Sequence, residues 1–268
     1  MSEQTEPNQI AATDINAEFD ANVSLKTIIG SPHAVSIAKA YIDQYYNDIA
    51  DGRNPLLTPI LLVGQSGMST FARAISNSFA NLHFKSSHSH WFSGGVQDLN
   101  RFFYFGNYGT TFYISAIDTL NIMSQYMLWK ILSNRRLNVN DYETKIPINA
   151  PLLNNLHIFS AKNTDNLTEP LLAQFPVKIF IGDLTRDELF YAIKQRATLL
   201  KLSYENDQVL FNIAIISGKD INMAMELLSL GMRLMRSNNE IVLTSKIMNT
   251  AFLLADANLK IATKKQLK

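Results

Sequence analysis

The sequence predicts an α/β protein in which a parallel sheet flanked by helices is followed by a small all-helical domain. Its 268 residues are enough for one large domain or two modest ones. Short apolar runs alternate with segments of helical periodicity as far as about residue 182. This alternation is typical of a parallel sheet that helices cover on both faces. From residue 183 onwards only helical periodicity continues, which predicts a separate helical domain.

Buried strands are predicted where a short apolar run is bounded by turn residues. They are expected at residues 60–63, 82–85, 111–115, 156–160 and 177–181. The first run, ILLV, ends at Gly64 and leads through a glycine-containing loop into a helix that carries Phe71, Ile75 and Phe79. An amphipathic helix over residues 32–49 precedes it. The fold therefore starts as helix, strand, loop and helix.

The second domain is predicted to begin with a helix at Thr185, because TRDE places Glu188 at the third position of a capping box. Further helices are expected at residues 207–216, 219–236 and 244–256. Acidic residues dominate the N-terminal segment, and lysines follow the last helix. We therefore divide the chain into an acidic tail (1–22), an α/β domain (23–182), a helical domain (183–260) and a basic tail (261–268).

Composition excludes several function classes. The chain has no cysteine, which excludes disulfides, thiolate nucleophiles and zinc sites with a Cys ligand. Its 24 Lys and Arg balance 23 Asp and Glu, so it has no strongly basic field for nucleic acid, and we do not expect it to bind nucleic acid. The acidic N-terminus does not resemble a signal peptide, and no apolar stretch reaches the ~18 residues that a membrane span needs. We expect a cytoplasmic protein that does not insert into membranes.

Two further patterns have competing explanations. His88 and His90 lie close together in SSHSHW, but no acidic residue is near them in the sequence, so we expect a surface loop and no metal site. An aromatic run covers residues 102–108. It is explained either by core packing or by anchors for a partner, and Phe105 and Tyr108 are the partner-contact candidates within it.

The loop after the first strand resembles the phosphate-binding loop of nucleotide hydrolases, whose pattern is Gly, four residues, Gly, Lys, then Ser or Thr. Without gaps, Ser69 replaces the second glycine, Thr70 the lysine and Phe71 the hydroxyl that holds magnesium. The alternative is an ordinary glycine turn between strand and helix. The loop that carries this resemblance comprises Gly64, Gln65, Ser66, Gly67, Met68, Ser69 and Thr70.

The segment TTFYISAIDTLNIMSQYMLWKILSNRRL resembles the Walker B strand and following helix of the RuvB branch of the AAA+ ATPases. In that family the strand ends in Asp-Glu, whereas Ser115 and Ala116 occupy these places here. Activation of a metal-bound water would need the carboxylates. Asp118 lies in the next turn, where we expect it to cap a helix.

The resemblance continues in the correct order over about residues 25–258, and it implies an AAA+ sheet followed by a helical lid domain. In IFSAKNTDNLTEPLLAQF, Leu172 and Gln174 replace the two arginines of the family's segment before the lid. In SGKDINMAMELL, Ile221 occupies the place of the sensor arginine. The segment between Leu137 and Leu156 resembles the family's hairpin insertion, with an ordinary loop as the alternative, and its Tyr142 and Ile146 are further partner-contact candidates.

The missing charged residues lead us to expect a catalytically inactive pseudo-ATPase, not an enzyme, without a cofactor and with weak nucleotide binding or none. The predicted function is that of a scaffold or adaptor subunit whose partners are other proteins of a larger bacterial assembly. RuvB-type motors continue into a winged-helix DNA-binding domain, which we expect this chain to lack. The alternatives are an accessory factor for DNA recombination or replication and a regulatory subunit that binds nucleotide without hydrolysis.

Overall fold

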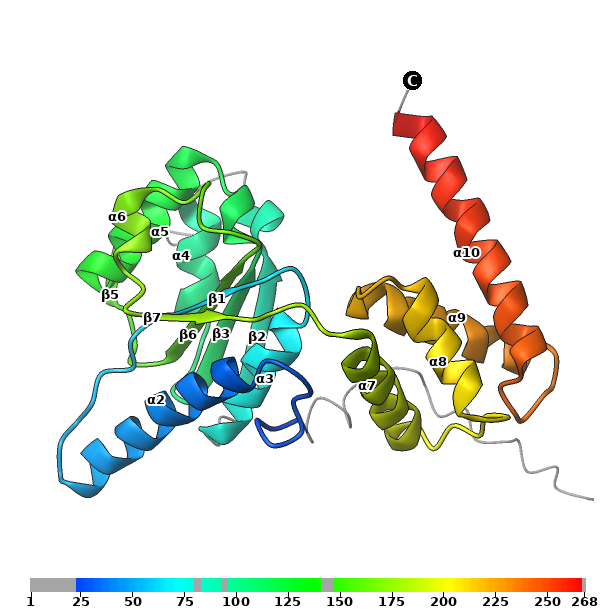
Figure 1. The fold of residues 1–268 in the computed structure, drawn as a ribbon. Coiled ribbons are helices and arrows are strands. Elements are labelled where there is room, and N and C mark those ends of the chain that lie inside the picture. The colour runs from blue at the N-terminus through cyan, green and yellow to red at the C-terminus, as the bar shows by residue number, and fades with distance from the viewer. Residues whose placement is uncertain (1–22, 80–82, 93–95, 141–146, 267–268) are drawn as a thin grey trace, which may run out of the picture. The chain divides into compact units, whose positions relative to one another are not determined.

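The computed structural model describes residues 23–266 apart from 80–82, 93–95 and 141–146 (Figure 1). The chain divides into two compact units, with the boundary between Asp183 and Leu184. The first unit is an α/β structure, and the second contains only helices among the described residues.

The α/β unit is built on a five-stranded sheet in which every pair of neighbouring strands is parallel, which confirms the predicted fold class. Strand β1 (Ile60–Val63) pairs with β6 (Leu156–Ala161) on one side and β7 (Val177–Phe180) on the other. Strand β3 (Thr110–Ser115) joins β6 to the edge strand β2 (His83–His88). All residues of β1 and β6 are buried; β1 is apolar throughout, whereas β6 also buries His157 and Ser160.

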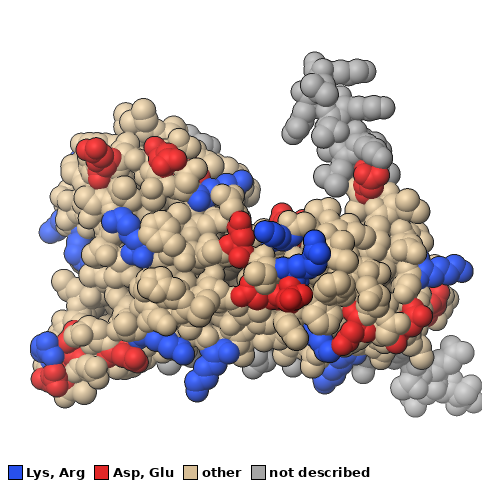
Figure 2. Space-filling view, viewed as in Figure 1, with Lys and Arg blue, Asp and Glu red and all other residues tan. Residues whose placement is uncertain are grey.

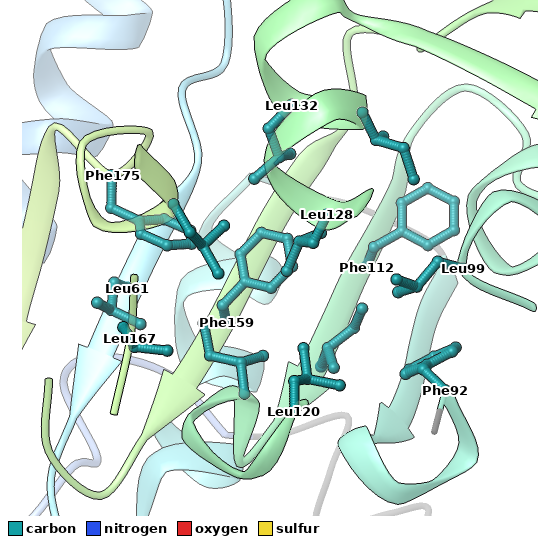
Figure 3. Close-up of a cluster of buried hydrophobic side chains, with 14 of the residues drawn as sticks. Leu61, Phe92, Leu99, Phe112, Leu120, Leu128, Leu132, Phe159, Leu167 and Phe175 are labelled. Atoms are coloured by element: carbon teal, nitrogen blue, oxygen red, sulfur yellow. The ribbon is translucent and has the colours of Figure 1, made fainter. Parts of the chain in front are cut away.

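Helices cover both faces of this sheet (Figure 1). Helices α2 (Pro32–Ala50) and α3 (Met68–Ser78) lie on one face, and α4 (Val96–Tyr104), α5 (Ile122–Asn134) and the short α6 (Glu169–Leu172) lie on the other. The second group packs on the sheet through one large apolar cluster (Figure 3). The cluster includes Leu61, Leu99, Phe112, Leu128, Phe159 and Phe175.

Two short 3-10 helices and a ribbon complete the unit. The 3-10 helices, η1 (Ser89–Phe92) and η2 (Ile117–Thr119), follow β2 and β3 at the carboxyl edge of the sheet. Strands β4 (Arg136–Asn140) and β5 (Pro147–Pro151) form an antiparallel ribbon where the sequence resembles a hairpin insertion. Asn138 of this ribbon donates its N–H to the side-chain oxygen of Asn100 on α4, so the ribbon is tied to that helix.

The helical unit consists of α7 (Arg186–Leu199), α8 (Asp207–Ile216), α9 (Ile221–Ser237) and α10 (Ser245–Gln266). The predicted capping box is present at α7: Glu188 donates its N–H to Thr185 Oγ1 (3.2 Å), and Thr185 donates its N–H to Glu188 Oε2 (2.7 Å). Helix α10 continues well beyond residue 256, where its end was predicted. Leu189, Ile213, Leu227 and Met248 belong to a separate apolar core of this unit.

In the described residues, none of the helices has an apolar stretch long enough to cross a membrane.

Candidate functional site

The carboxyl ends of the parallel strands bring the loops of the α/β unit to one edge of the sheet. Val63 at the end of β1 lies opposite Ala161 of β6 and Phe180 of β7. Two backbone hydrogen bonds continue this pairing beyond the strand, from Gly64 N to Ala161 O (3.1 Å) and from Ile181 N to Val63 O (2.8 Å). In parallel α/β sheets, ligands bind at this edge. A ligand-binding site is therefore expected at this edge.

The loop of residues 64–67 connects β1 to α3 at this edge. A Cβ atom on Gly64 would lie 2.6 Å from the carbonyl oxygen of Ile181, so only glycine allows the loop to pass so close to the end of β7. Gly67 adopts a left-handed conformation (φ 78°) and immediately precedes Met68, the first residue of α3. Ser69 and Thr70 therefore lie in the first turn of the helix.

This arrangement presents backbone N–H groups at the helix start. The first turn of a helix has N–H groups without an intrahelical partner and carries the positive end of the helix dipole. Loops of this kind hold phosphate groups. Residues 64–70 contain no charged side chain, so within this segment only the backbone and the hydroxyls of Ser66, Ser69 and Thr70 can attract an anion.

The end of β3 also lacks carboxylates, as the sequence indicates. Ser115 is half-buried, and its hydroxyl lies 3.4 Å from the carbonyl oxygen of Ser87 on β2. Ala116 is in the left-handed conformation (φ 57°) and precedes η2. Its carbonyl oxygen accepts a hydrogen bond from the Thr119 hydroxyl (2.8 Å), so the turn is fixed by its own residues.

Asp118 does not cap a helix, so that prediction is wrong. The N-cap of α5 is Asn121, whose side-chain oxygen accepts the N–H of Ser124 (2.8 Å). Asp118 lies within η2 and is 8% exposed, and its Oδ1 has no hydrogen-bond partner among the described residues. It is the buried carboxyl group closest in sequence to Ser115 and Ala116.

The structure also places Asp118 within electrostatic reach of His88. Where a surface loop was predicted, His88 is the last residue of strand β2 and His90 lies in the 3-10 helix η1, and both side chains are exposed. His88 Nδ1 lies 2.8 Å from His90 Nδ1 and accepts the N–H of His90 (3.2 Å). Burial lowers the pKa of His88 and the neighbouring His90 lowers it further, while Asp118 opposes both. Within the described residues no three His, Asp or Glu side chains form a group that could hold a metal ion.

None of the three residues at the family's arginine positions is charged, and two of them pack against apolar clusters. Leu172 is partly buried against the large apolar cluster, and Gln174 is half-buried, with its side-chain nitrogen 3.4 Å from the carbonyl oxygen of Pro170. Both lie in the α/β unit, whereas Ile221 is the first residue of α9 and packs on the core of the helical unit. The N-cap of α9 is Asp220, whose side chain accepts the N–H groups of Asn222 and Met223.

The aromatic run divides into core and surface. Phe103 is 2% exposed, whereas Phe105 and Tyr108 are 67% and 78% exposed on the loop between α4 and β3. Gly106 fixes this loop to the core, because a Cβ atom there would lie 2.0 Å from the ring of Phe112. Asn155 also donates its side-chain N–H to the carbonyl oxygen of Asn107 (2.9 Å). Tyr142 and Ile146, the other partner-contact candidates, lie outside the described residues.

Sequence reasoning missed two groups. His157 is fully buried in β6 and stacks on Phe112, with ring centroids 5.4 Å apart. A cavity between α4, α5 and the β4–β5 ribbon is lined by Lys130, Arg136 and several asparagines. Neither has a local sequence signal, because both depend on contacts between elements far apart in the chain.

Comparison with known proteins identifies the architecture. No family model matches the sequence, and no curated protein matches it. Solved structures of Thermotoga maritima RuvB do match: two point mutants of RuvB, each at a TM-score of 0.68 and 16% identity, and the RuvB Holliday junction branch migration motor at a TM-score of 0.66 and 17% identity. These matches cover 87–88% of this chain and 72–73% of the RuvB chains.

These matches correct one prediction and confirm another. The prediction that the chain is not an enzyme is contradicted, because the structures that resemble it are those of RuvB, among them the RuvB Holliday junction branch migration motor. At this level of identity the likeness establishes the architecture alone. The sheet order, the flanking helices and the RuvB structures together show that the chain has the RuvB-like fold of the AAA+ ATPases.

Proposed function

We propose that the chain serves as an adaptor or scaffold subunit of a larger protein assembly. The observation that supports this most is the exposure of Phe105 and Tyr108 on a loop that is fixed to the core. Large aromatic side chains bury much apolar area when they dock, and they are enriched among the residues that dominate protein interfaces. A subunit of this kind can also bind or turn over nucleotide.

The charge distribution favours a protein partner over nucleic acid. Lys and Arg are interspersed with Asp and Glu on the face shown in Figure 2, as the net charge of +1 suggests. Nucleic-acid binders instead gather cations into a patch or stripe. The branch migration motor among the matching structures supports the alternative of an accessory role in DNA processing. Binding of a four-way DNA junction that weakens steeply with salt would favour that role.

Nucleotide binding is a second candidate function. It is supported by the 64–67 loop, which leads into the first turn of α3 at the carboxyl edge of the sheet. Backbone N–H groups in such a loop can hold the phosphates of ATP or ADP. Because residues 64–70 include no cation, we expect millimolar affinity.

The adaptor proposal is tested with Tyr108→Ala. The full chain, tagged in its native cell, is cross-linked and purified, and its partner is identified by mass spectrometry and then purified. A desolvated aromatic anchor contributes about 2 kcal/mol. We therefore expect Tyr108→Ala to weaken partner binding about thirtyfold with an unchanged melting temperature.

Tyr191→Ala is the matched control, because Tyr191 is 58% exposed on α7 in the helical unit. It should leave partner binding unchanged. Equal loss in both variants, or unfolding of Tyr108→Ala, would contradict an interface at the 105–108 loop.

A further inference from the structure

A cavity of about 350 Å³ opens between α4, α5 and the β4–β5 ribbon of the α/β unit. Helix α5 contributes Met127, Lys130, Ile131 and Asn134, helix α4 contributes Asn100, and the ribbon contributes Arg136, Asn138 and Asn149. Its volume lies at the lower end of the range that small-molecule pockets occupy. The cavity belongs to neither the 64–67 loop nor the 105–108 loop.

The lining is cationic and rich in amides. Among the described residues, the lining contains two cations and four asparagines and no carboxylate. Within the described part of the chain, neither Lys130 nor Arg136 forms an ion pair. Lys130 on α5 and Arg136 on the ribbon bring two like charges to the same cavity, and an anion bound there would reduce their repulsion.

Hydrogen bonds hold the wall in place and orient its donors. Arg136 Nε donates to Asn149 Oδ1 (2.8 Å) across the ribbon. Because the side-chain oxygen of Asn149 accepts this bond, the side-chain NH₂ group of Asn149 is the group that can donate to a ligand. Asn100 Oδ1 accepts the backbone N–H of Asn138 (2.9 Å), and Asn100 is only 1% exposed. The ribbon is therefore fixed against α4, and the amide oxygens of Asn149 and Asn100 are already used.

The floor of the cavity is apolar. Ile131 is 2% exposed, and Met127 is half-buried beside it. A ligand that fits both the cationic lining and the apolar floor has a compact apolar body and one oxyanion group. Lys provides a point charge for such a group, and the planar guanidinium of Arg can bind two of its oxygens.

We propose that this cavity binds a small organic oxyanion, either a phosphate monoester or a carboxylate. The anionic group contacts Lys130, Arg136 and the amides of the ribbon, and the apolar body lies on Met127 and Ile131.

The test uses the full chain with ¹³C-labelled methyl groups of methionine and isoleucine. Phenyl phosphate and benzoate are titrated as probes, with neutral benzyl alcohol as the reference. We expect both anions to shift the methyl signals of Met127 and Ile131, and Lys130→Gln to weaken this binding at least tenfold. Tighter binding of phenyl phosphate identifies a phosphate ester as the natural class, and tighter binding of benzoate identifies a carboxylate.

Lys246→Gln is the control, since Lys246 is an exposed cation on α10 in the helical unit. It should leave the affinity of both anions unchanged. The proposal is overturned if the two methyl signals do not shift, if Lys130→Gln binds as tightly as the parent, or if benzyl alcohol binds as well as the anions. None of these results depends on the 105–108 loop, so the adaptor proposal is tested separately.

Discussion

At the scale of single residues, His157 is a buried side chain whose ionisation is coupled to folding. Its ring is 1% exposed and lies parallel to the ring of Phe112, with 5° between the planes. Burial lowers the pKa of His157 to about 3, and the charge of Arg135 contributes to the same direction. The histidine is therefore neutral in the folded protein at pH 7.

This shift predicts a loss of stability in mild acid. In the unfolded chain a histidine has a pKa of about 6.5, so between pH 6.5 and 3 the unfolded state binds a proton that the folded state does not. The free energy of unfolding should fall by about 1.4 kcal/mol per pH unit in this window, or about 2 kcal/mol between pH 6.5 and 5. Urea unfolding at pH 7 and pH 5 measures this change in the free energy of unfolding.

Two variants identify the source of that loss. His157→Leu cannot be protonated and should lose about 2 kcal/mol less than the parent protein between pH 7 and 5. His83→Leu removes an exposed histidine at the start of β2 and should behave as the parent does. An identical pH dependence in all three proteins would show that His157 does not cause the loss.

At the scale of elements, the turn from β1 into α3 is where we propose that nucleotide binds. Ser66→Asp places a carboxylate in the loop that leads into the first turn of α3. Its charge should repel phosphate from the N–H groups there, so we expect calorimetry to show at least tenfold weaker binding of ATP and ADP. Ser133→Asp on the exposed side of α5 adds the same charge elsewhere and should have no effect. If Ser66→Asp leaves the affinity unchanged, nucleotide does not use this loop.

Elements show most clearly what sequence can predict. Strand β1 was predictable because its four residues are all buried in the middle of the sheet and are all apolar. Strand β2 was predicted too short, because it pairs only with β3 and its sequence HFKSSH has exposed and half-buried positions but no fully buried one. An edge strand needs less burial, so its apolar pattern is weaker.

The site was harder to predict than the fold. The 64–67 loop was found because its residues are contiguous. Asp118 and His88 lie 30 residues apart in the numbering, and the electrostatic interaction between them follows from the pairing of β2 with β3. The cavity at Lys130 and Arg136 likewise depends on the hydrogen bond between the β4–β5 ribbon and α4. Tertiary contacts of this kind leave no local pattern in a single sequence.

At the scale of the whole molecule, the two units have separate apolar cores. The core of the α/β unit includes Phe159, and that of the helical unit includes Ile213. Both side chains are fully buried, so truncation of either to alanine should cost about 2–5 kcal/mol.

Because the cores are separate, each substitution should destabilise only the unit that contains it. In hydrogen-exchange mass spectrometry, Phe159→Ala should raise amide exchange in residues 24–183, and Ile213→Ala should raise it from residue 184 onwards. Each variant serves as the control for the other. Increased exchange across both units in either variant would mean that the chain unfolds as one cooperative body.

The contact of Gly106 with Phe112 also has a consequence for the speed and strength of association. A loop that is already held in one conformation loses little conformational entropy when a partner docks on it. Phe105 and Tyr108 would then need no rearrangement of the backbone before binding. A larger residue in place of Gly106 would force the loop away from the Phe112 ring. Phe105 and Tyr108 could then dock only after the loop had returned to its binding conformation.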